Sequence, residues 1–219
     1  MKLKVNELFY SVQGETTTAG FLSFFIRLTG CNLDCAYCDT RYAREEGRDM
    51  PIELILEAVR RSGPFHHITV TGGEPLCQEG TPELLSRLVS LRNSVQIETN
   101  GSIGLERVPR GVRKIVDVKT PSSGHAGCFL MSNLRLLQPG DELKFVVSDR
   151  DDFVFARDFI RKHLAGTDAV INLSPAYGKI DPAELAGLIL AEGLKVRLNL
   201  QLHKIIWGSE EESKVIINI

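Results

Sequence analysis

Short apolar segments that alternate with amphipathic segments limit the fold of this chain more than any other feature of its sequence. The segments with the composition and length of buried strands are 21–29, 67–71, 95–99, 114–118, 143–148, 169–173 and 195–200. Helical patterns fall between several of them, at 51–62, 82–91, 151–164 and 182–192. Strands that alternate with helices form a parallel sheet with the helices packed outside it. We therefore expect an α/β fold, an incomplete (β/α) barrel with about six core parallel strands; an open doubly wound sheet is the alternative.

Two polar stretches, 41–50 and 121–138, interrupt the pattern and are predicted to be loops or short helical insertions. The last helix has clear boundaries, because Asp181 is placed to cap it, Pro182 suits its first turn and Gly193 marks its end. Neither an internal repeat nor a low-complexity linker divides the chain. We expect residues 1–219 to form a single domain.

The composition favours a small molecule as the binding partner. A net charge of −2, with no cluster of Lys and Arg, argues against a nucleic-acid partner. Polar residues interrupt the N-terminus too early for a signal peptide, and no apolar run reaches the length of a membrane span. We therefore expect a cytoplasmic protein without a membrane partner. Hydrophobic residues make up 43% of the chain, which suffices for a buried core.

Three of the five cysteines, Cys31, Cys35 and Cys38, form a Cys-x3-Cys-x2-Cys motif directly after the first buried strand. Thiolates suit iron–sulfur clusters or zinc. Three ligands leave one iron of a [4Fe–4S] cluster open, whereas a structural zinc site normally has four ligands and no second pair accompanies this motif. The spacing therefore predicts a [4Fe–4S] cluster, with a catalytic zinc as the alternative. Cys77 and Cys128 match no ligand spacing and are interpreted as small apolar residues.

This motif resembles the one that defines the radical S-adenosylmethionine (radical SAM) superfamily. The resemblance implies that the open iron binds S-adenosylmethionine, and that an electron from the cluster releases a 5′-deoxyadenosyl radical from it. It also implies that Tyr37, Cys38 and Asp39 lie beside this cofactor. For Tyr37 the alternative is an ordinary tyrosine that packs within the loop.

A second motif, Thr71-Gly72-Gly73-Glu74-Pro75, follows the next strand. Paired glycines let the backbone approach a ligand closely, and a carboxylate accepts hydrogen bonds from an ammonium group. By resemblance to the superfamily, Gly73 and Glu74 bind the methionine end of the cofactor. Further cofactor contacts are implied at the carboxyl ends of later strands, where a barrel builds its active site. These residues are Glu98, Lys119, Thr120, Pro121, Ser122, Ser174, Pro175, Ala176 and Tyr177.

Nearly the whole chain resembles the 7-carboxy-7-deazaguanine synthase family, from SVQGE at residues 11–15 through CDT, TGGEP and ETNG to SPAYGKID and QLHKIIWG. The resemblance implies that 6-carboxy-5,6,7,8-tetrahydropterin is converted to 7-carboxy-7-deazaguanine with loss of ammonia, a step in 7-deazapurine and queuosine biosynthesis. It further implies that S-adenosylmethionine is regenerated, that magnesium assists, that the enzyme is a homodimer and that an electron donor such as a flavodoxin is needed.

The resemblance also implies contacts with the pterin substrate, at Val12, Gln13, Gly14, Arg27 and Thr71. Arg27 stands among apolar strand residues, where a charge needs a partner. We expect it to bind the substrate carboxylate, while a structural ion pair is the alternative. The resemblance assigns magnesium to the threonine of the CDT segment, Thr40, whose hydroxyl is a hard oxygen ligand; a capping or turn-forming hydroxyl is the alternative.

Two other functions share parts of this pattern. An activase that installs a glycyl radical on a partner protein has the same cysteine spacing and a similar size. The VQG segment and Arg27 argue against it, because they suit a small heterocyclic carboxylate. A non-catalytic iron–sulfur or zinc module is disfavoured because the cysteine motif occurs together with TGGEP.

Overall fold

The computed structural model describes residues 1–91, 93–208 and 215–217. Within this part of the chain, seven strands pair in parallel in the order β2, β4, β5, β6, β7, β8 and β9. Their bounds are Leu22–Leu28, His67–Gly72, Val95–Thr99, Val112–Asp117, Glu142–Val147, Val170–Pro175 and Arg197–Leu198. The last of these has only two residues, so the predicted segment 195–200 is mostly not a strand.

Four helices connect the parallel strands as predicted, with ends that differ by no more than one residue. They are α1 (Ile52–Arg61), α2 (Thr81–Ser90), α3 (Arg150–His163) and α4 (Pro182–Glu192). Asp181 caps α4 as expected, since its carboxylate accepts a hydrogen bond of 2.7 Å from the backbone N–H of Ala183. A short helix, α5 (Leu202–Trp207), follows the sheet and was not predicted.

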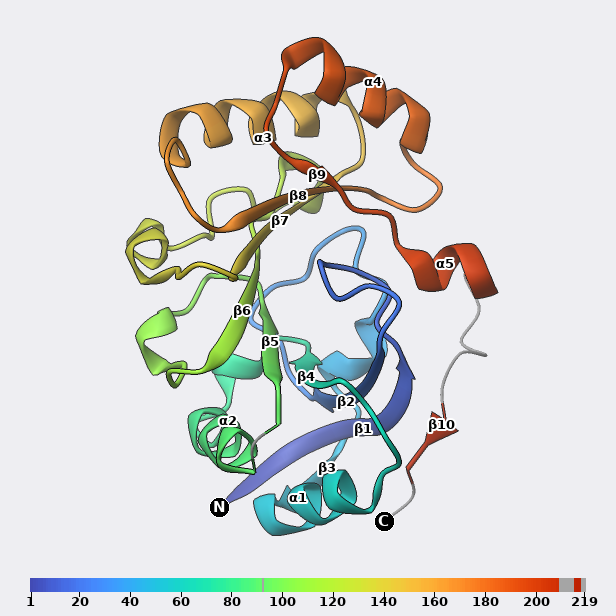
Figure 1. Ribbon diagram of the computed structural model, residues 1–219, viewed down its shortest axis with the longest axis vertical. Coiled ribbons are helices and arrows are strands. Elements are labelled where there is room, and N and C mark those ends of the chain that lie inside the picture. The colour runs from blue at the N-terminus through green and yellow to red at the C-terminus, as the bar shows by residue number, and fades with distance from the viewer. Residues whose placement is uncertain (92, 209–214, 218–219) are drawn as a thin grey trace.

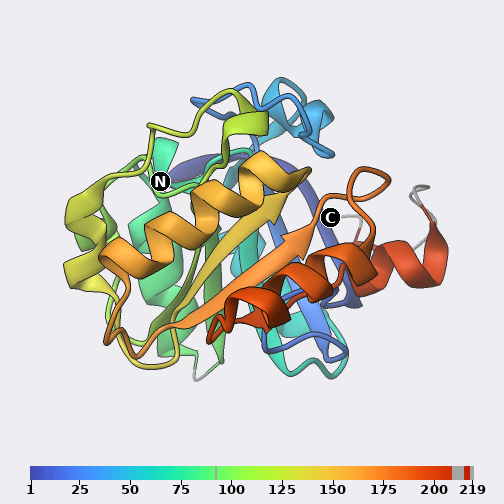
Figure 2. The ribbon, with the colours of Figure 1, turned by 90° about the horizontal axis from the view of Figure 1, so that it is seen from above.

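The curved sheet with its helices outside gives the molecule the shape of an incomplete barrel (Figure 1). The sheet ends at β9 on one side and does not close. Viewed from above, α3 and α4 cover β7 and β8 (Figure 2). The expected incomplete (β/α) barrel is therefore confirmed, with seven parallel strands rather than about six, and the doubly wound alternative is wrong.

An antiparallel ribbon at the other side of the sheet was missed by the sequence analysis. The long strand β1 (Lys2–Val12) pairs antiparallel with β2, with β3 (Arg48–Pro51) and with β10 (Val215–Ile216). The segment 41–50 was predicted to be a loop or a short helical insertion; it contains the 3-10 helix Arg41–Arg44, as expected, but ends in β3, which is a correction. The tail after residue 208, to which the sequence assigned no role, lies outside the described residues apart from 215–217.

The stretch 121–138 forms loops and two 3-10 helices, Pro121–Ser123 and Met131–Leu136, as predicted. No helix among the described residues is long and apolar enough to cross a membrane.

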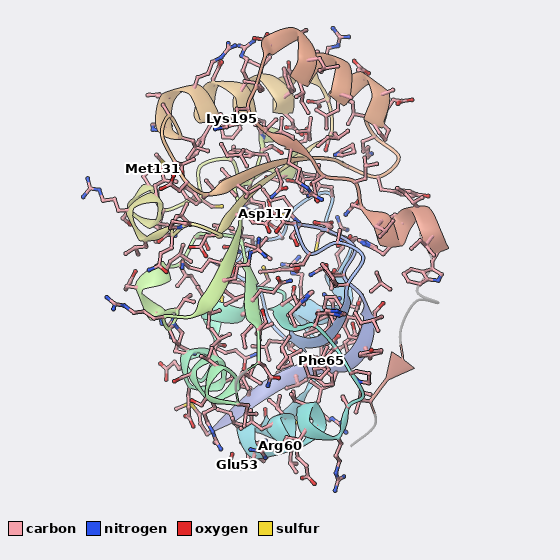
Figure 3. The ribbon with its side chains drawn as sticks, in the orientation of Figure 1. Glu53, Arg60, Phe65, Asp117, Met131 and Lys195 are labelled. Atoms are coloured by element: carbon pink, nitrogen blue, oxygen red, sulfur yellow. The ribbon has the colours of Figure 1, made fainter. Side chains whose placement is uncertain are left out.

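Side chains alternate between the two faces of each parallel strand, and this alternation separates the core from the cavity. On β2, Phe24 and Ile26 are fully buried in the hydrophobic core, whereas Phe25 and Arg27 line a cavity inside the barrel. Asp117, which also lines the cavity, lies near the centre of the molecule, whereas the exposed residues Glu53 and Arg60 lie at its edge (Figure 3).

Candidate active site

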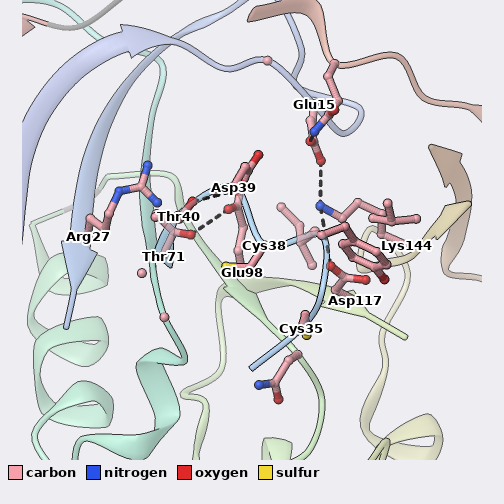
Figure 4. A pocket seen from close by; sticks show the side chains of 18 of the residues that line it. Glu15, Arg27, Cys35, Cys38, Asp39, Thr40, Thr71, Glu98, Asp117 and Lys144 are labelled. Atoms are coloured by element: carbon pink, nitrogen blue, oxygen red, sulfur yellow. Dashed lines mark hydrogen bonds and ion pairs between the residues drawn. The ribbon is translucent and has the colours of Figure 1, made fainter. Parts of the chain in front are cut away.

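A cavity of about 640 Å³ lies inside the barrel, where the parallel strands end (Figure 4). The cysteine loop, β1 and the segment after it, five parallel strands and α5 contribute to its wall. Sixteen of the predicted site residues line it. They are Val12, Gln13, Gly14, Arg27, Cys31, Cys35, Tyr37, Cys38, Asp39, Thr40, Thr71, Gly73, Glu98, Lys119, Ala176 and Tyr177.

The cysteine loop presents all three predicted thiols to this one cavity. A backbone hydrogen bond of 3.1 Å from Cys38 to the carbonyl of Cys35 closes the turn between them. Burial raises the pKa of the thiols of Cys31 and Cys35. Each thiolate of a [4Fe–4S] cluster binds a different iron, so three thiols that open onto one cavity fit such a cluster. No group of three His, Cys, Asp or Glu side chains in the described residues could hold a single metal ion.

The glycine pair after β4 packs against the start of the cysteine loop. A Cβ atom on Gly73 would lie 2.1 Å from the carbonyl oxygen of Gly30 and 2.8 Å from the Cβ of Cys31. On Gly72, whose φ is 150°, a Cβ would lie 2.1 Å from the carbonyl oxygen of Leu28. Both positions therefore require glycine, and the backbone of this pair forms part of the cavity wall.

Glu74 does not line the cavity, and its carboxylate is bonded to other groups of the protein. Its carboxylate is fully buried and accepts three hydrogen bonds, from the hydroxyl of Thr99 at 2.9 Å and from the backbone N–H groups of Leu76 at 3.0 Å and Asn100 at 2.7 Å. These bonds tie the turn after β4 to the end of β5. The contact of Glu74 with the methionine end of the cofactor stays a prediction.

Tyr37 and Lys119 meet where the cysteine loop passes the end of β6. The Lys119 ammonium lies 5.9 Å from the centre of the Tyr37 ring, and the Tyr37 hydroxyl is 3.3 Å from that of Thr120. Thr120, Pro121 and Ser122 do not line the cavity: the backbone N–H of Ser122, for example, donates to Asp152 at 2.8 Å. Their contacts with the cofactor also stay predictions.

At the end of β8, too, only some of the predicted residues line the cavity. Ser174 and Pro175 belong to the strand and are buried, and the Ser174 hydroxyl accepts a hydrogen bond of 2.8 Å from Asn199. Ala176 and Tyr177 follow the strand and line the cavity. Of the four residues predicted here, the structure thus brings two to the site.

The segment Val12–Gly14 forms another part of the cavity wall. The Gln13 side chain is buried and its amide lies 3.4 Å from both Thr69 and Glu98. A Cβ on Gly14 would lie 1.9 Å from Nδ1 of His203, so only glycine lets α5 approach this closely. The backbone N–H of Leu202 also donates to the carbonyl of Gly14 at 2.8 Å. Together these contacts hold the start of α5 against the segment.

Thr71 and Glu98 form a polar pair at the ends of the neighbouring strands β4 and β5. The Thr71 hydroxyl donates to Glu98 Oε2 at 2.8 Å. Burial raises the pKa of the Glu98 carboxyl, and the nearby charge of Lys144 only partly offsets this effect. Glu98 therefore carries a proton at a higher pH than an ordinary glutamate.

Arg27 combines the two roles considered for it. Its Nε donates to Glu7 Oε1 at 2.7 Å, and its guanidinium lies 5.4 Å from the centre of the Phe9 ring. The structural ion pair is thus present. Arg27 also lines the cavity (Figure 4), as does Phe25. The Phe25 ring stacks on that of Phe9 with centroids 4.7 Å apart. A role in binding the substrate carboxylate stays compatible with this position, because the guanidinium both pairs with Glu7 through Nε and lines the cavity.

Asp39 and Thr40 stand at the mouth of the cavity. The Thr40 hydroxyl donates to Asp39 Oδ1 at 3.0 Å and makes no capping bond to the 3-10 helix that follows. Lys204 on α5 reaches Asp39 Oδ2 at 3.3 Å. Two oxygen-bearing side chains are therefore adjacent here, which is the type of ligand that magnesium prefers.

The charged groups at the centre of the cavity were not predicted. Glu15, Asp117 and Lys144 all line it, and an ion pair of 2.7 Å joins Lys144 to Glu15. Gln201, the residue before α5, and His203 within α5 also line the cavity. The sequence contained a signal for the first three, since Glu15 belongs to the SVQGE segment and the other two stand on predicted strands.

Comparisons with known proteins agree with this site. A family model described as the Radical SAM superfamily matches residues 25–121, the part that carries both motifs. The 7-carboxy-7-deazaguanine synthase of Koribacter versatilis is 43% identical over 95% of this chain and 98% of that protein. The enzyme of the same name from Chlorobaculum tepidum is 41% identical over 95% and 96%.

Solved structures show the same architecture. The crystal structure of QueE from Escherichia coli matches with a TM-score of 0.76 and 25% sequence identity, over 93% of this chain and 95% of that one. Streptococcus suis SuiB, with 16% identity and a TM-score of 0.57 over 78% of this chain and 46% of that one, shares the fold alone. With a radical SAM cysteine loop in an open barrel and full-length relatives above 40% identity, this chain belongs to the 7-carboxy-7-deazaguanine synthase family.

Proposed function

We propose that this protein converts 6-carboxy-5,6,7,8-tetrahydropterin to 7-carboxy-7-deazaguanine with loss of ammonia, a carbon–nitrogen lyase reaction of queuosine precursor biosynthesis. The observation that carries the proposal is that the cysteine loop and Arg27 open onto one cavity of about 640 Å³. A cluster site and a carboxylate-binding residue are thus available to the same small ligand. The synthase name of the relatives supports this reaction over a glycyl-radical activase.

Cys31, Cys35 and Cys38 would hold the [4Fe–4S] cluster. When bound, the cluster and S-adenosylmethionine supply the 5′-deoxyadenosyl radical that abstracts hydrogen from C6 of the substrate. The protein contributes orientation and the exclusion of water. Gly73 and Tyr37 line the same cavity as the cysteines and would orient the cofactor.

The substrate side of the cavity combines an apolar wall with polar groups. Phe9 and Phe25 offer their stacked rings to a flat heterocycle, and Arg27 beside them offers a guanidinium to its carboxylate. On the neighbouring strand, Thr71 pairs with Arg27 in the sheet and supplies a hydroxyl for the heteroatoms of the ring. Because the pKa of Glu98 is raised, its carboxyl can hold a proton on the cavity wall beside Thr71.

We further propose that magnesium binds at Thr40, where its remaining ligands come from substrate and water. The family resemblance also supports a homodimer, an electron donor such as a flavodoxin, and a cytoplasmic location.

The test is anaerobic turnover of the tetrahydropterin by the reconstituted protein, with the product identified by its mass. We expect the mass of 7-carboxy-7-deazaguanine, and a product that depends on S-adenosylmethionine and a reductant. The Cys35→Ala variant is the matched negative control. Formation of 5′-deoxyadenosine without conversion of the pterin would contradict the proposed substrate, and uptake of stoichiometric zinc without iron would contradict the cluster.

A further inference from the structure

Lys144 lies between two carboxylates that come from distant parts of the chain. Its ammonium is 2.7 Å from Glu15 Oε2 and 3.9 Å from Asp117 Oδ2 (Figure 4). The three side chains are only 16%, 13% and 17% exposed. Lys144 stands on β7, directly opposite Asp117 on β6. It therefore links the sheet to the segment that follows β1.

The two carboxylates come from parts of the cavity wall to which different ligands are assigned. Glu15 follows Gly14 in the segment predicted to bind the substrate, and Gln201 holds its other oxygen at 2.7 Å. Asp117 lies on the cofactor side, because its Oδ2 is 2.8 Å from Lys119, whose ammonium approaches the Tyr37 ring. Lys144 thus spans from the residues expected around the pterin to those expected around S-adenosylmethionine.

At neutral pH, attraction between opposite charges holds Lys144, Glu15 and Asp117 together. Burial alone would lower the pKa of Lys144, but the charges of Glu15 and Asp117 outweigh burial and raise it. For both carboxylates burial acts in the opposite direction, and the neighbouring lysines outweigh it, so the pKa of each stays below its usual range. All three groups are therefore ionised, and a displacement of one changes the Coulomb energy of the others.

Asp117 has an acceptor that the protein leaves open. Among the described residues, its Oδ1 is buried and has no hydrogen-bond partner. Lys119 already neutralises the Asp117 carboxylate through Oδ2. A structural ion pair needs no second positive charge, and Lys144 at 3.9 Å supplies one. A buried oxygen without a donor is destabilising, and a ligand donor that pairs with it would change the position and charge distribution of Asp117.

We propose that Lys144 is a positioning residue that couples the two halves of the cavity, so that a ligand on the cofactor side strengthens binding on the substrate side. The proposal rests on the proposed function, which names the two ligands. A ligand bound next to Asp117 fixes that carboxylate, Lys144 is fixed by it in turn, and Glu15 is then held for the second ligand. Such coupling is reciprocal between the two binding equilibria.

The test measures the dissociation constant of the product, 7-carboxy-7-deazaguanine, on the anaerobic cluster-loaded protein by calorimetry, with and without S-adenosylmethionine. In the parent we expect the cofactor to tighten product binding about fivefold or more, the usual lower range of allosteric coupling. In Lys144→Met the ratio should fall to within about twofold of one. Lys114→Met is the matched control, because Lys114 forms an equally short and buried ion pair with Asp141 outside the cavity.

The outcomes separate this inference from the function on which it rests. A parent that does not bind the product overturns both. Binding without a cofactor effect in the parent, or a ratio that survives in Lys144→Met, overturns the coupling role alone. If Lys144→Met does not fold, Glu15→Gln/Lys144→Met removes the ion pair without leaving an unpaired charge at position 15. The same loss of the ratio is expected from it, and retention of the ratio overturns the coupling role.

Discussion

The two faces of the sheet at β6 and β7 carry similar ion pairs with different surroundings. On the inner face, Lys144 meets Glu15 at 2.7 Å; on the outer face, Lys114 meets Asp141 at the same distance. Asp141 is saturated by the protein, since it also accepts hydrogen bonds of 2.8 Å from the backbone N–H groups of Lys114 and Gln138. On the inner face, Asp117 keeps one acceptor, Oδ1, that no group in the described part of the chain pairs with.

This difference indicates how to distinguish structural from functional buried charges in such a barrel. A buried charge whose hydrogen bonds are all supplied by the protein stabilises the fold, and its environment is complete without a ligand. A buried charge with open acceptors, on the wall of a cavity, has an environment that a ligand completes. The comparison predicts that outer-face changes affect stability, and that inner-face changes near the strand ends affect binding and turnover.

The largest expected effect comes from the cysteine loop. Replacing any one of Cys31, Cys35 and Cys38 with Ala should reduce turnover at least about a thousandfold, because a cluster ligand is lost, while the protein stays folded because the barrel core carries its stability. Iron content, product formation and the unfolding transition are measured together. Cys77→Ala is the control, since this exposed cysteine does not line the cavity. Full turnover in any of the three variants would refute the ligand assignment.

On the outer face, Lys114→Met should lower the free energy of unfolding by about 3 to 5 kcal/mol, because it leaves the buried Asp141 carboxylate without its counter-charge. Denaturant titration measures this change. Below the unfolding transition, KM and kcat should stay within about twofold of the parent. A specific loss of turnover in fully folded protein would break the distinction between the two faces.

The inner face also has a structural part, at the opposite end of the strands from the cavity. His67 at the start of β4 is buried, its Nε2 has no partner among the described residues, and burial lowers its pKa to about 4. The unfolded chain, with an ordinary pKa of 6.5, binds the proton first, so the contribution of His67 is complete above about pH 6.5 and is lost as the pH falls towards 4.

A shift of this size corresponds to about 3 kcal/mol between these limits. We expect His67→Gln to reduce the loss of unfolding free energy between pH 7 and pH 4 by about that amount, as measured by denaturant titration at each pH. His163→Gln, at an exposed position on α3, is the control. Parallel curves for the parent and His67→Gln would show that this histidine does not govern acid stability.

Much of the fold could be predicted because the parallel strands and their helices have strong local patterns. The strand 95–99 and the helix 182–192 were predicted with the bounds that the structure shows. The ribbon strand β1 was missed although Leu3 and Val5 alternate with lysines, because the search followed longer apolar segments. The segment 195–200 was assigned as a strand from its composition, but only two of its residues pair with β8.

In the candidate site, the sequence also predicted the features that depend on neighbouring residues and missed those that depend on contacts between distant parts of the chain. The cysteine spacing and the glycine pair are local, and the structure brings both to the cavity. The pair between Glu15 and Lys144 joins residues 129 positions apart, and a strand pattern indicates where a side chain stands but not which partner it meets. For Glu74, the motif could not show that the carboxylate is buried behind the wall.

Arg27 tests whether one buried charge can be both structural and functional. Arg27→Lys should raise KM for the pterin about tenfold to a hundredfold with a smaller change in kcat, because lysine cannot bind a carboxylate through a planar fork. Steady-state kinetics measures this. Glu7→Gln removes the negative charge beside Nε while keeping an acceptor, and it should mainly lower stability. An unchanged KM in Arg27→Lys would leave Arg27 as a structural residue of the inner face.

The smallest expected effect concerns Thr40 at the mouth of the cavity. Its hydroxyl does not cap the helix that follows, so the capping role suggested by its position is absent, although it donates to Asp39 at 3.0 Å. If Thr40 supplies one oxygen ligand to magnesium, Thr40→Ala should raise the magnesium concentration needed for half-maximal stimulation of turnover about twofold to tenfold, the effect of losing one polar contact. Thr40→Ser keeps the hydroxyl and should behave like the parent, whereas cluster content and cofactor cleavage without substrate should be equal in all three proteins. Identical magnesium titrations for Thr40→Ala and the parent would place the metal elsewhere and leave Thr40 as a residue that orients Asp39.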